Sequence, residues 1–103
     1  MEKEVKKYIS EHMVDDISVT KIAEELHFNP QYLMRAFKKK TDMSIVEYIT
    51  KVRMDTAKKI LQETNLPVKD VAGMVGYSDY AYFNRVFKKE TGVSPKHYRS
   101  KIG

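Results

Sequence analysis

Cysteine is absent from this chain of 103 residues, which excludes disulfide bonds, thiolate metal sites and a cysteine nucleophile. Long apolar runs are also missing, because no stretch approaches the about 20 residues that a transmembrane helix needs. The first ten residues, MEKEVKKYIS, do not have the composition of a secretory signal peptide. No segment shows the alternating pattern of a strand. These absences favour an all-α protein with a cytoplasmic location and no membrane association.

Acidic residues are scarce in the second half of the chain. Residues 51–103 contain 11 Lys/Arg and 5 Asp/Glu, whereas residues 1–50 contain 8 and 9, and the net charge is +5. A basic bias indicates a polyanionic partner, although it is weak evidence until the charges are placed. The length suits one compact domain, or two very small units that share a common element.

The chain contains an internal duplication. At an offset of 49 residues, apolar positions coincide in Val19/Val68, Ile22/Val71, Ala23/Ala72, Leu26/Val75 and Phe28/Tyr77. One extra residue then enters the second copy, and at an offset of 50 the matches are Tyr32/Tyr82, Leu33/Phe83, Arg35/Arg85, Phe37/Phe87, Lys38/Lys88, Lys39/Lys89, Thr41/Thr91, Ser44/Ser94 and Tyr48/Tyr98. Two copies are too few for a solenoid, so the pattern indicates a duplicated module.

Each copy predicts two short helices with a tight turn between them. In the first copy Ser18 caps a helix through Leu26, and Asn29 with Pro30 restarts a helix that runs to about Lys40. In the second copy Gly76 provides the turn and Ser78 is the predicted cap. Gly76 suits a left-handed conformation, which its counterpart His27 adopts only with strain.

A long helix is predicted between the copies, and shorter helices at the two ends. The capping-box pattern Ser44–Glu47 opens the central helix, which runs to about Glu63 and is roughly 28 Å long. Val5, Tyr8, Ile9 and Met13 on a first helix, and Tyr98 and Ile102 on a last one, close the two cores. The expected division is 1–43, a linker helix 44–63, and 64–103.

The helix pairs match the helix-turn-helix pattern, with Ala23 and Ala72 as the small residues where helices cross closely. The second helix of each copy carries side chains suited to base edges: Arg for guanine, Gln and Asn for adenine, Ala and Met for the thymine methyl group. The candidate base contacts are Gln31, Met34, Arg35, Tyr80, Ala81, Asn84 and Arg85. The candidate phosphate contacts are Lys38, Lys39, Lys40, Lys88, Lys89 and Arg99.

Simpler interpretations exist for these residues. Arg35 or Arg85 alone would be expected to pair with a nearby carboxylate, but their recurrence at one register favours DNA. Tyr80 and Tyr82 could stack on single-stranded bases. Tyr32, Tyr82, Phe37 and Phe87 recur at helical spacing, however, which favours a place in the core, with Tyr48 and Tyr98 plugging the two cores.

The run from Gly76 to Arg99, GYSDYAYFNRVFKKETGVSPKHYR, closely resembles the defining motif of the AraC/XylS family of bacterial transcription regulators. The resemblance extends from about Val5 to Arg99. It implies seven helices, with two helix-turn-helix subdomains on a long central helix and the third and sixth helices in adjacent major-groove segments. Two departures stand out. Met34 replaces a polar residue that is common there, and Asp42 stands where the second copy has Gly92.

The resemblance also implies the partners. We expect double-stranded DNA at a non-palindromic site, and RNA polymerase as a protein partner. We also expect an N-terminal sensor or receiver domain in the full-length protein, with a standalone chain as the alternative. No cofactor or metal is expected.

Three other classes compete with this prediction. His12, His27 and His97 lie far apart without ligand spacing or a nucleophile motif, so an enzyme is disfavoured and no catalytic residue is predicted. A helical bundle that only binds proteins is the stronger rival, and it predicts no salt-dependent DNA binding. An RNA-binding module would carry motifs that we do not find.

Overall fold

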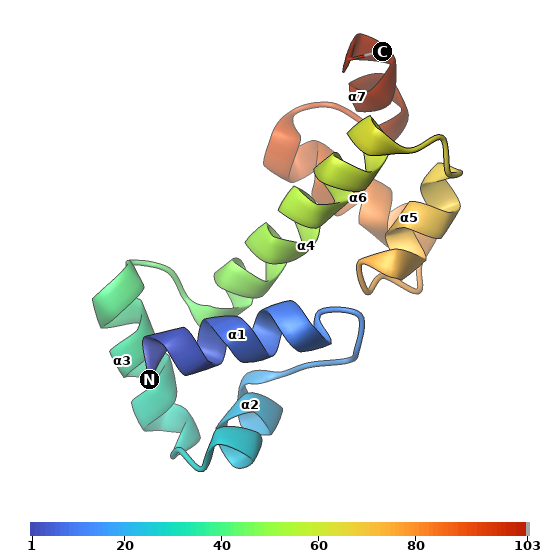
Figure 1. Cartoon of the computed structure of the whole chain (residues 1–103). Helices are drawn as coiled ribbons and strands as arrows, with labels where there is room; N and C mark the ends of the chain where they lie inside the picture. Colours follow the sequence, from blue (N-terminus) through green and yellow to red (C-terminus); the bar gives the residue numbers. More distant parts are fainter. Residues whose placement is uncertain (103) are drawn as a thin grey trace. The chain divides into compact units, whose positions relative to one another are not determined.

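The computed structural model describes residues 1–102, and within them all regular structure is helical, as predicted. Figure 1 shows the helices in chain order: α1 (Glu2–His12), α2 (Val19–Leu26), α3 (Pro30–Thr41), α4 (Ile45–Glu63), α5 (Val68–Met74), α6 (Tyr80–Thr91) and α7 (Pro95–Ile102). The side chain of Ile102, predicted to help close the second core, lies outside the described part of the chain.

The chain forms two compact units, Met1–Val52 and Arg53–Gly103. The boundary falls inside α4, so the first part of this helix belongs to one unit and the remainder to the other. Each copy of the repeat therefore completes its core with its own portion of the central helix. A unit of about 50 residues has little apolar surface to bury, and the shared helix supplies part of it.

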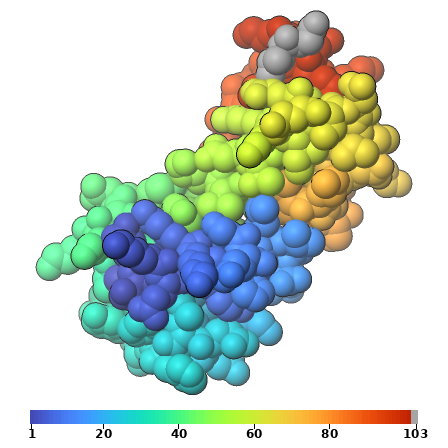
Figure 2. Space-filling view, in the orientation of Figure 1, coloured from blue at the N-terminus to red at the C-terminus, as the bar shows by residue number. Residues whose placement is uncertain are grey.

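In the first unit α1 packs against the α2–α3 pair, and the ribbon and space-filling views agree on this (Figure 1, Figure 2). The core is apolar throughout and consists of Val5, Ile9, Ile22, Ala23, Leu33, Phe37, Ile45 and Ile49. Tyr48 is partly buried against it, and its ring meets that of Phe37 edge-on at 5.7 Å. Two buried positions on α1, four residues apart, thus place one face of this helix on the helix pair.

The second unit repeats this arrangement around α5, α6 and α7. Its core contains Met54, Ala57, Leu61, Val71, Ala72, Val75, Tyr77, Phe83 and Phe87. Tyr98 is partly buried against the core and meets Phe87 edge-on at 5.5 Å, which matches the contact between Tyr48 and Phe37. The predicted plugging role of both tyrosines is confirmed. Met54 is not among the apolar contacts that the sequence predicts along the central helix, which are Ile45, Tyr48, Ile49, Val52, Ala57, Ile60 and Leu61.

The turns inside the two helix pairs have the same backbone geometry. His27 has φ 63° and Gly76 has φ 103°, so the left-handed conformation occurs in both copies. The residue after each turn closes it: the amide of Phe28 donates to Ala23 O over 2.8 Å, and that of Tyr77 donates to Ala72 O over 2.9 Å. Ala23 and Ala72 are each 1% exposed, as a close crossing requires.

Candidate nucleic-acid interface

The second helix of each pair, α3 or α6, begins directly after a residue whose side chain caps it. The Oδ1 atom of Asn29 accepts a hydrogen bond from the amide of Tyr32 over 3.0 Å, as predicted. In α6 the cap is Asp79, whose Oδ1 accepts from the amide of Tyr82 over 3.1 Å. The predicted cap Ser78 was therefore wrong by one residue. Asp79 stands 50 residues after Asn29, so the extra residue of the second copy enters before the cap.

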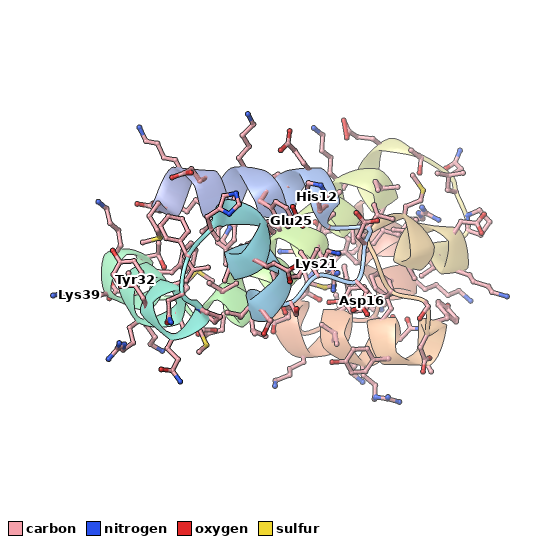
Figure 3. The ribbon with its side chains drawn as sticks, turned by 90° about the horizontal axis from the view of Figure 1, so that it is seen from below. His12, Asp16, Lys21, Glu25, Tyr32 and Lys39 are labelled. Carbon is pink, nitrogen blue, oxygen red and sulfur yellow. The ribbon has the colours of Figure 1, made fainter. Side chains whose placement is uncertain are left out.

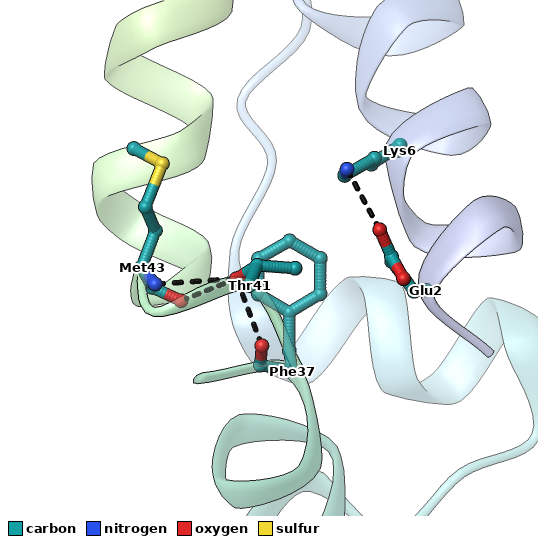
Figure 4. A network of polar contacts seen from close by, with 5 residues as sticks. All are labelled: Glu2, Lys6, Phe37, Thr41 and Met43. Atoms are coloured by element: carbon teal, nitrogen blue, oxygen red, sulfur yellow. Dashed lines mark hydrogen bonds and ion pairs between the residues drawn. The ribbon is translucent and has the colours of Figure 1, made fainter. Parts of the chain in front are cut away.

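The far ends of α3 and α6 also match. The hydroxyl of Thr41 donates to Phe37 O over 2.8 Å and accepts from the amide of Met43 over 3.2 Å (Figure 4). Thr91 makes the same two contacts, over 2.7 Å and 3.3 Å, with Phe87 O and the amide of Val93. These bonds satisfy backbone groups that a helix end leaves unpaired.

The residue after each of these helices is left-handed in both copies. Asp42 has φ 62° and Gly92 has φ 88°, and each amide donates to the carbonyl of Lys38 or Lys88 over 2.8 Å. The substitution of Asp for Gly, which departs from the family pattern, therefore leaves this helix end in the same conformation. The aspartate is strained there, because a left-handed backbone disfavours side chains.

The N-terminus of α4 is held by the predicted capping box. The Ser44 amide donates to Glu47 Oε1 over 2.9 Å, and the Glu47 amide donates to Ser44 Oγ over 3.0 Å. The hydrogen bonds from Ser44, backbone first and then side chain, lower the pKa of the Glu47 carboxyl, with a smaller effect of the Lys38 charge. This box fixes the start of α4 beside the end of α3.

The two helices expose the same register positions. Leu33 and Phe37 in α3, and Phe83 and Phe87 in α6, are fully buried, so the opposite face is turned to solvent. That face carries nearly all of the predicted base contacts, namely Gln31, Met34, Arg35, Tyr80, Ala81 and Arg85, while Asn84 is half-buried. The predicted lysines, Lys38, Lys39, Lys40, Lys88 and Lys89, are exposed as well. Figure 3 shows Lys39 extending away from the ribbon.

Arg35 and Arg85 have no carboxylate partner within residues 1–102. The residues three and four positions away on the same helix are apolar, amide, aromatic or basic in both cases, so local pairing along the helix is not available. Their charges remain directed to solvent. An exposed guanidinium without a carboxylate partner can bind a guanine edge with two hydrogen bonds.

The two faces differ in polarity. A hollow of about 470 Å³ lies beside α3 in the first unit, lined mainly by apolar surface from Val19, Met34, Arg35, Lys38, Lys39, Ser44, Ile45 and Val46. Met34 is 44% and Val46 is 62% exposed. At the offset of 50 residues the second copy has Asn84 and Lys96 instead. Val46 was not among the predicted site residues, and its register with Lys96 was the signal that could have identified it.

Asn84 and Arg99 bind groups within the domain. The Nδ2 atom of Asn84 donates to Tyr80 O over 3.1 Å, which uses one of its two N–H groups and leaves the other, together with Oδ1, for a base edge. Arg99 donates from Nε to Leu61 O over 3.2 Å and from Nη1 to Leu66 O over 2.6 Å. We therefore remove Arg99 from the candidate phosphate contacts.

Tyr32 and Tyr82 are 52% and 49% exposed, so the predicted place in the core is wrong for both. Phe37 and Phe87, predicted on the same grounds, are fully buried. Both tyrosines occupy the third position of their helix, beside the turn. Tyr32 stacks on Phe28 at 6.3 Å, and Tyr82 packs on Tyr77 at 5.9 Å. They cover the turn and leave one side to solvent, at the edge of the basic faces.

The histidines do not form a site. His12 stacks on Tyr8 at 4.1 Å and its Nδ1 lies 2.9 Å from Tyr8 O, while His27 terminates α2. Lys21 and Glu25 project from α2 on the side where His12 lies (Figure 3). No cluster of three metal-ligating side chains occurs within residues 1–102, and no helix in that part is long and apolar enough to cross a membrane.

Lys40 lies at a different place from Lys38 and Lys39. The pKa of Glu2 is lowered chiefly by its hydrogen bond from Lys6, over 2.8 Å (Figure 4). The charge of Lys40 adds a smaller lowering. The positive charge of Lys40 therefore acts on the Glu2 carboxylate of α1. Among the basic residues at the end of α3, Lys38 and Lys39 line the hollow and Lys40 does not.

The chain contains two helix-turn-helix units, and the second helix of each is exposed and basic. This arrangement is that of a DNA-binding domain, a double helix-turn-helix. A family model described as a helix-turn-helix domain matches residues 22–101. The chain belongs to the AraC/XylS family of transcription regulators.

Individual relatives agree with this assignment. The bifunctional transcriptional activator/DNA repair enzyme AdaA of Bacillus subtilis is 36% identical over 95 residues, which cover 92% of this chain and 45% of that protein. The arabinose operon regulatory protein of Escherichia coli is 33% identical over 99 residues, covering 95% and 34%. The chain thus spans less than half of either relative.

A solved structure matches closely. The C-terminal domain of AraT, a response regulator from Geobacillus stearothermophilus, superposes with a TM-score of 0.94 at 37% identity, covering 97% of this chain and 84% of that one. The relatives are transcription regulators by name. Their shared segment is the double helix-turn-helix.

Proposed function

We propose that this chain recognises a specific site on double-stranded DNA through α3 and α6, and that it thereby regulates bacterial transcription. The observation that carries the proposal is the recurrence, in two units, of one exposed face with Arg35 or Arg85 at its centre. Family membership and the operon regulators among the relatives support it. The two helices are called the first and second recognition helix below.

The side chains divide into two roles. Arg35 and Arg85 each lie six residues after the N-cap of their helix, Asn29 or Asp79, and are suited to base edges, with Gln31, Met34, Tyr80, Ala81 and Asn84 around them. Lys38, Lys39, Lys88 and Lys89 lie further along the helices and are suited to phosphates, which position a protein without reading sequence. Because the recognition helices differ at Met34/Asn84, the bound site is expected to be non-palindromic.

The relatives suggest what surrounds this activity. One is a response regulator from which the matching segment is the C-terminal domain. We infer that an N-terminal sensor or receiver domain controls the DNA binding of this chain in its full-length protein, and that RNA polymerase is recruited at the promoter. The cytoplasm is the compartment that fits these roles. The double helix-turn-helix itself performs no chemical reaction in this proposal.

Selection of bound duplexes from a random pool tests the proposal and reveals the site. On the selected site Arg85→Ala should relax the preference at one or two base pairs and cost roughly 1–3 kcal/mol. Lys88→Ala should weaken all duplexes about equally and reduce the log–log salt slope by about 0.9. Lys7→Ala, a cation outside the recognition helices, is the matched control. No enriched duplex, or an affinity that is flat with salt, would remove DNA as the partner.

A further inference from the structure

Arg85 is held by an aromatic side chain in the second unit. Its guanidinium carbon lies 5.7 Å from the ring centre of Tyr82, one helical turn earlier in α6. Tyr82 in turn packs on Tyr77 at 5.9 Å, and Tyr77 is only 9% exposed. We propose that Tyr82 is a positioning residue that orients the Arg85 guanidinium for base recognition, and that the second recognition helix therefore discriminates base pairs more strongly than the first.

The side chain under Tyr82 is anchored in the core. Tyr77 packs on Phe83 at 5.5 Å, inside the core, and the guanidinium carbon of Arg53 from α4 lies 5.3 Å from its ring centre. A row of four side chains thus extends from α4 to the exposed face of α6: Arg53, Tyr77, Tyr82, Arg85. The ring of Tyr82 contacts this buried neighbour at an interplanar angle of 52°, which restricts its rotamers.

The first unit provides the comparison. Tyr32 and Arg35 have the same spacing on α3, and Tyr32 also rests on an aromatic residue, Phe28, at 6.3 Å. Within residues 1–102, however, the Arg35 guanidinium does not lie over the Tyr32 ring. Arg35 lines the apolar hollow with Met34 instead. The two copies therefore share the aromatic pair and differ in whether it holds the arginine.

A guanidinium on an aromatic face keeps its function as a reader. Arginine stacks on aromatic faces through the flat side of its guanidinium, whereas the N–H groups that bind guanine O6 and N7 lie in the plane of that group. Stacking therefore restricts the rotamers of Arg85 without occupying its donors. Less conformational entropy is then lost on binding, so the correct base pair gains affinity.

The experiment builds on the proposed function and uses the selected duplex together with two variants of it, one with the base pair under Arg85 substituted and one with the base pair under Arg35 substituted. Tyr82→Leu removes the ring, and Tyr82→Phe keeps it. Tyr32→Leu makes the same change in the first unit. Affinities are compared for the correct and substituted duplexes, and each variant is also combined with Arg85→Ala. The chemical shift of the Arg85 side chain in the free protein reports the ring contact without DNA.

Tyr82→Leu should lower the discrimination at that base pair by about two- to five-fold, the effect of an exposed cation–π contact. Tyr82→Phe should keep both the discrimination and the ring-shifted Arg85 resonance. Tyr32→Leu should change the discrimination under Arg35 less. In the Arg85→Ala background Tyr82→Leu should have no further effect on discrimination.

Two results overturn the inference. Full discrimination in Tyr82→Leu shows that the ring does not position Arg85, and an equal loss in the Arg85→Ala background shows that Tyr82 contacts DNA itself. Both leave the proposed function intact, because Arg85→Ala still relaxes the preference. If Arg85→Ala alone changes no base preference, Arg85 is not a reader, and the role proposed for it fails together with the inference.

Discussion

Arg99 in α7 donates a hydrogen bond from Nη1 to the carbonyl oxygen of Leu66 over 2.6 Å, 33 residues earlier in the chain. Its Nε donates to Leu61 O, at the end of α4. A single guanidinium thus joins the last helix to the final turn of the central one and to the segment that follows. Gln62 adds a bond to Tyr98 over 2.6 Å in the same region.

Arg99→Ala should therefore destabilise the fold. Loss of the two bonds is expected to cost about 1–3 kcal/mol and to lower the midpoint of thermal unfolding. Lys101→Ala, which removes an exposed cation from the same helix, should leave the midpoint unchanged. The salt slope of DNA binding should stay at the wild-type value in Arg99→Ala. A slope reduced by about 0.9 would instead restore Arg99 as a phosphate contact.

Ala72→Leu should destabilise the second unit. Ala72 is 1% exposed inside the helix pair, so the larger side chain overpacks the crossing at a cost of about 1–3 kcal/mol. The neighbouring Gly73 has open space around its Cβ position, and Gly73→Ala should stabilise α5 by up to about 1 kcal/mol. Thermal melting of the two variants should give shifts of opposite sign. An unchanged midpoint in Ala72→Leu would show that the crossing has room.

Asp42→Gly should stabilise the first unit. Asp42 adopts φ 62°, where glycine is favoured, and its negative charge stands at the C-terminal end of α3, where the helix dipole disfavours it. A gain of about 1 kcal/mol is expected from thermal melting. Gly92→Ala makes the opposite kind of change in the second unit and should lower the stability by a similar amount, because Gly92 has φ 88°. A loss in Asp42→Gly would mean that the side chain makes a compensating contact.

Simultaneous use of both recognition helices has a consequence for DNA spacing. Insertion of five base pairs between the two contact zones of the selected site rotates one zone by about half a turn, since a helical turn has about 10–10.5 base pairs. Tight binding should then be abolished, whereas the same insertion outside the site should have no effect. Retained affinity would show that one recognition helix suffices.

Local features of the fold could be predicted from the sequence alone. The caps Ser18 and Asn29, the capping box of Ser44 and Glu47, and the turn at Gly76 all act within about four residues, so their signals are visible in a short window. The cap that was wrongly predicted at Ser78 shows the limit of predicting helix ends from such short windows. Two adjacent residues, Ser78 and Asp79, are both good caps, and the helix uses the one that stands in register with Asn29.

The candidate interface could be predicted in part. The duplication placed Arg35 and Arg85 at one register, opposite Leu33, Phe37, Phe83 and Phe87, and the structure turns both arginines to solvent. Helical periodicity is enough for this inference, because the charged face of an amphipathic helix lies opposite its buried apolar stripe. Periodicity does not predict the role of each side chain on the exposed face, because several of these side chains contact one another.

The sequence by itself therefore determined the duplicated helix pairs, most of their ends and the apolar residues at the centre of their buried stripes, because these depend on neighbours along one helix. The tertiary structure alone decided that Tyr32 and Tyr82 are half-exposed whereas Phe37 and Phe87 are buried. It also decided that Arg99 binds the carbonyls of Leu61 and Leu66, and that Arg85, unlike Arg35, rests on a tyrosine ring. Two properties depend on which distant segment packs against a helix: how far a side chain at the edge of the apolar stripe is exposed, and which group a long side chain binds. Spacing along the chain does not encode which segment that is.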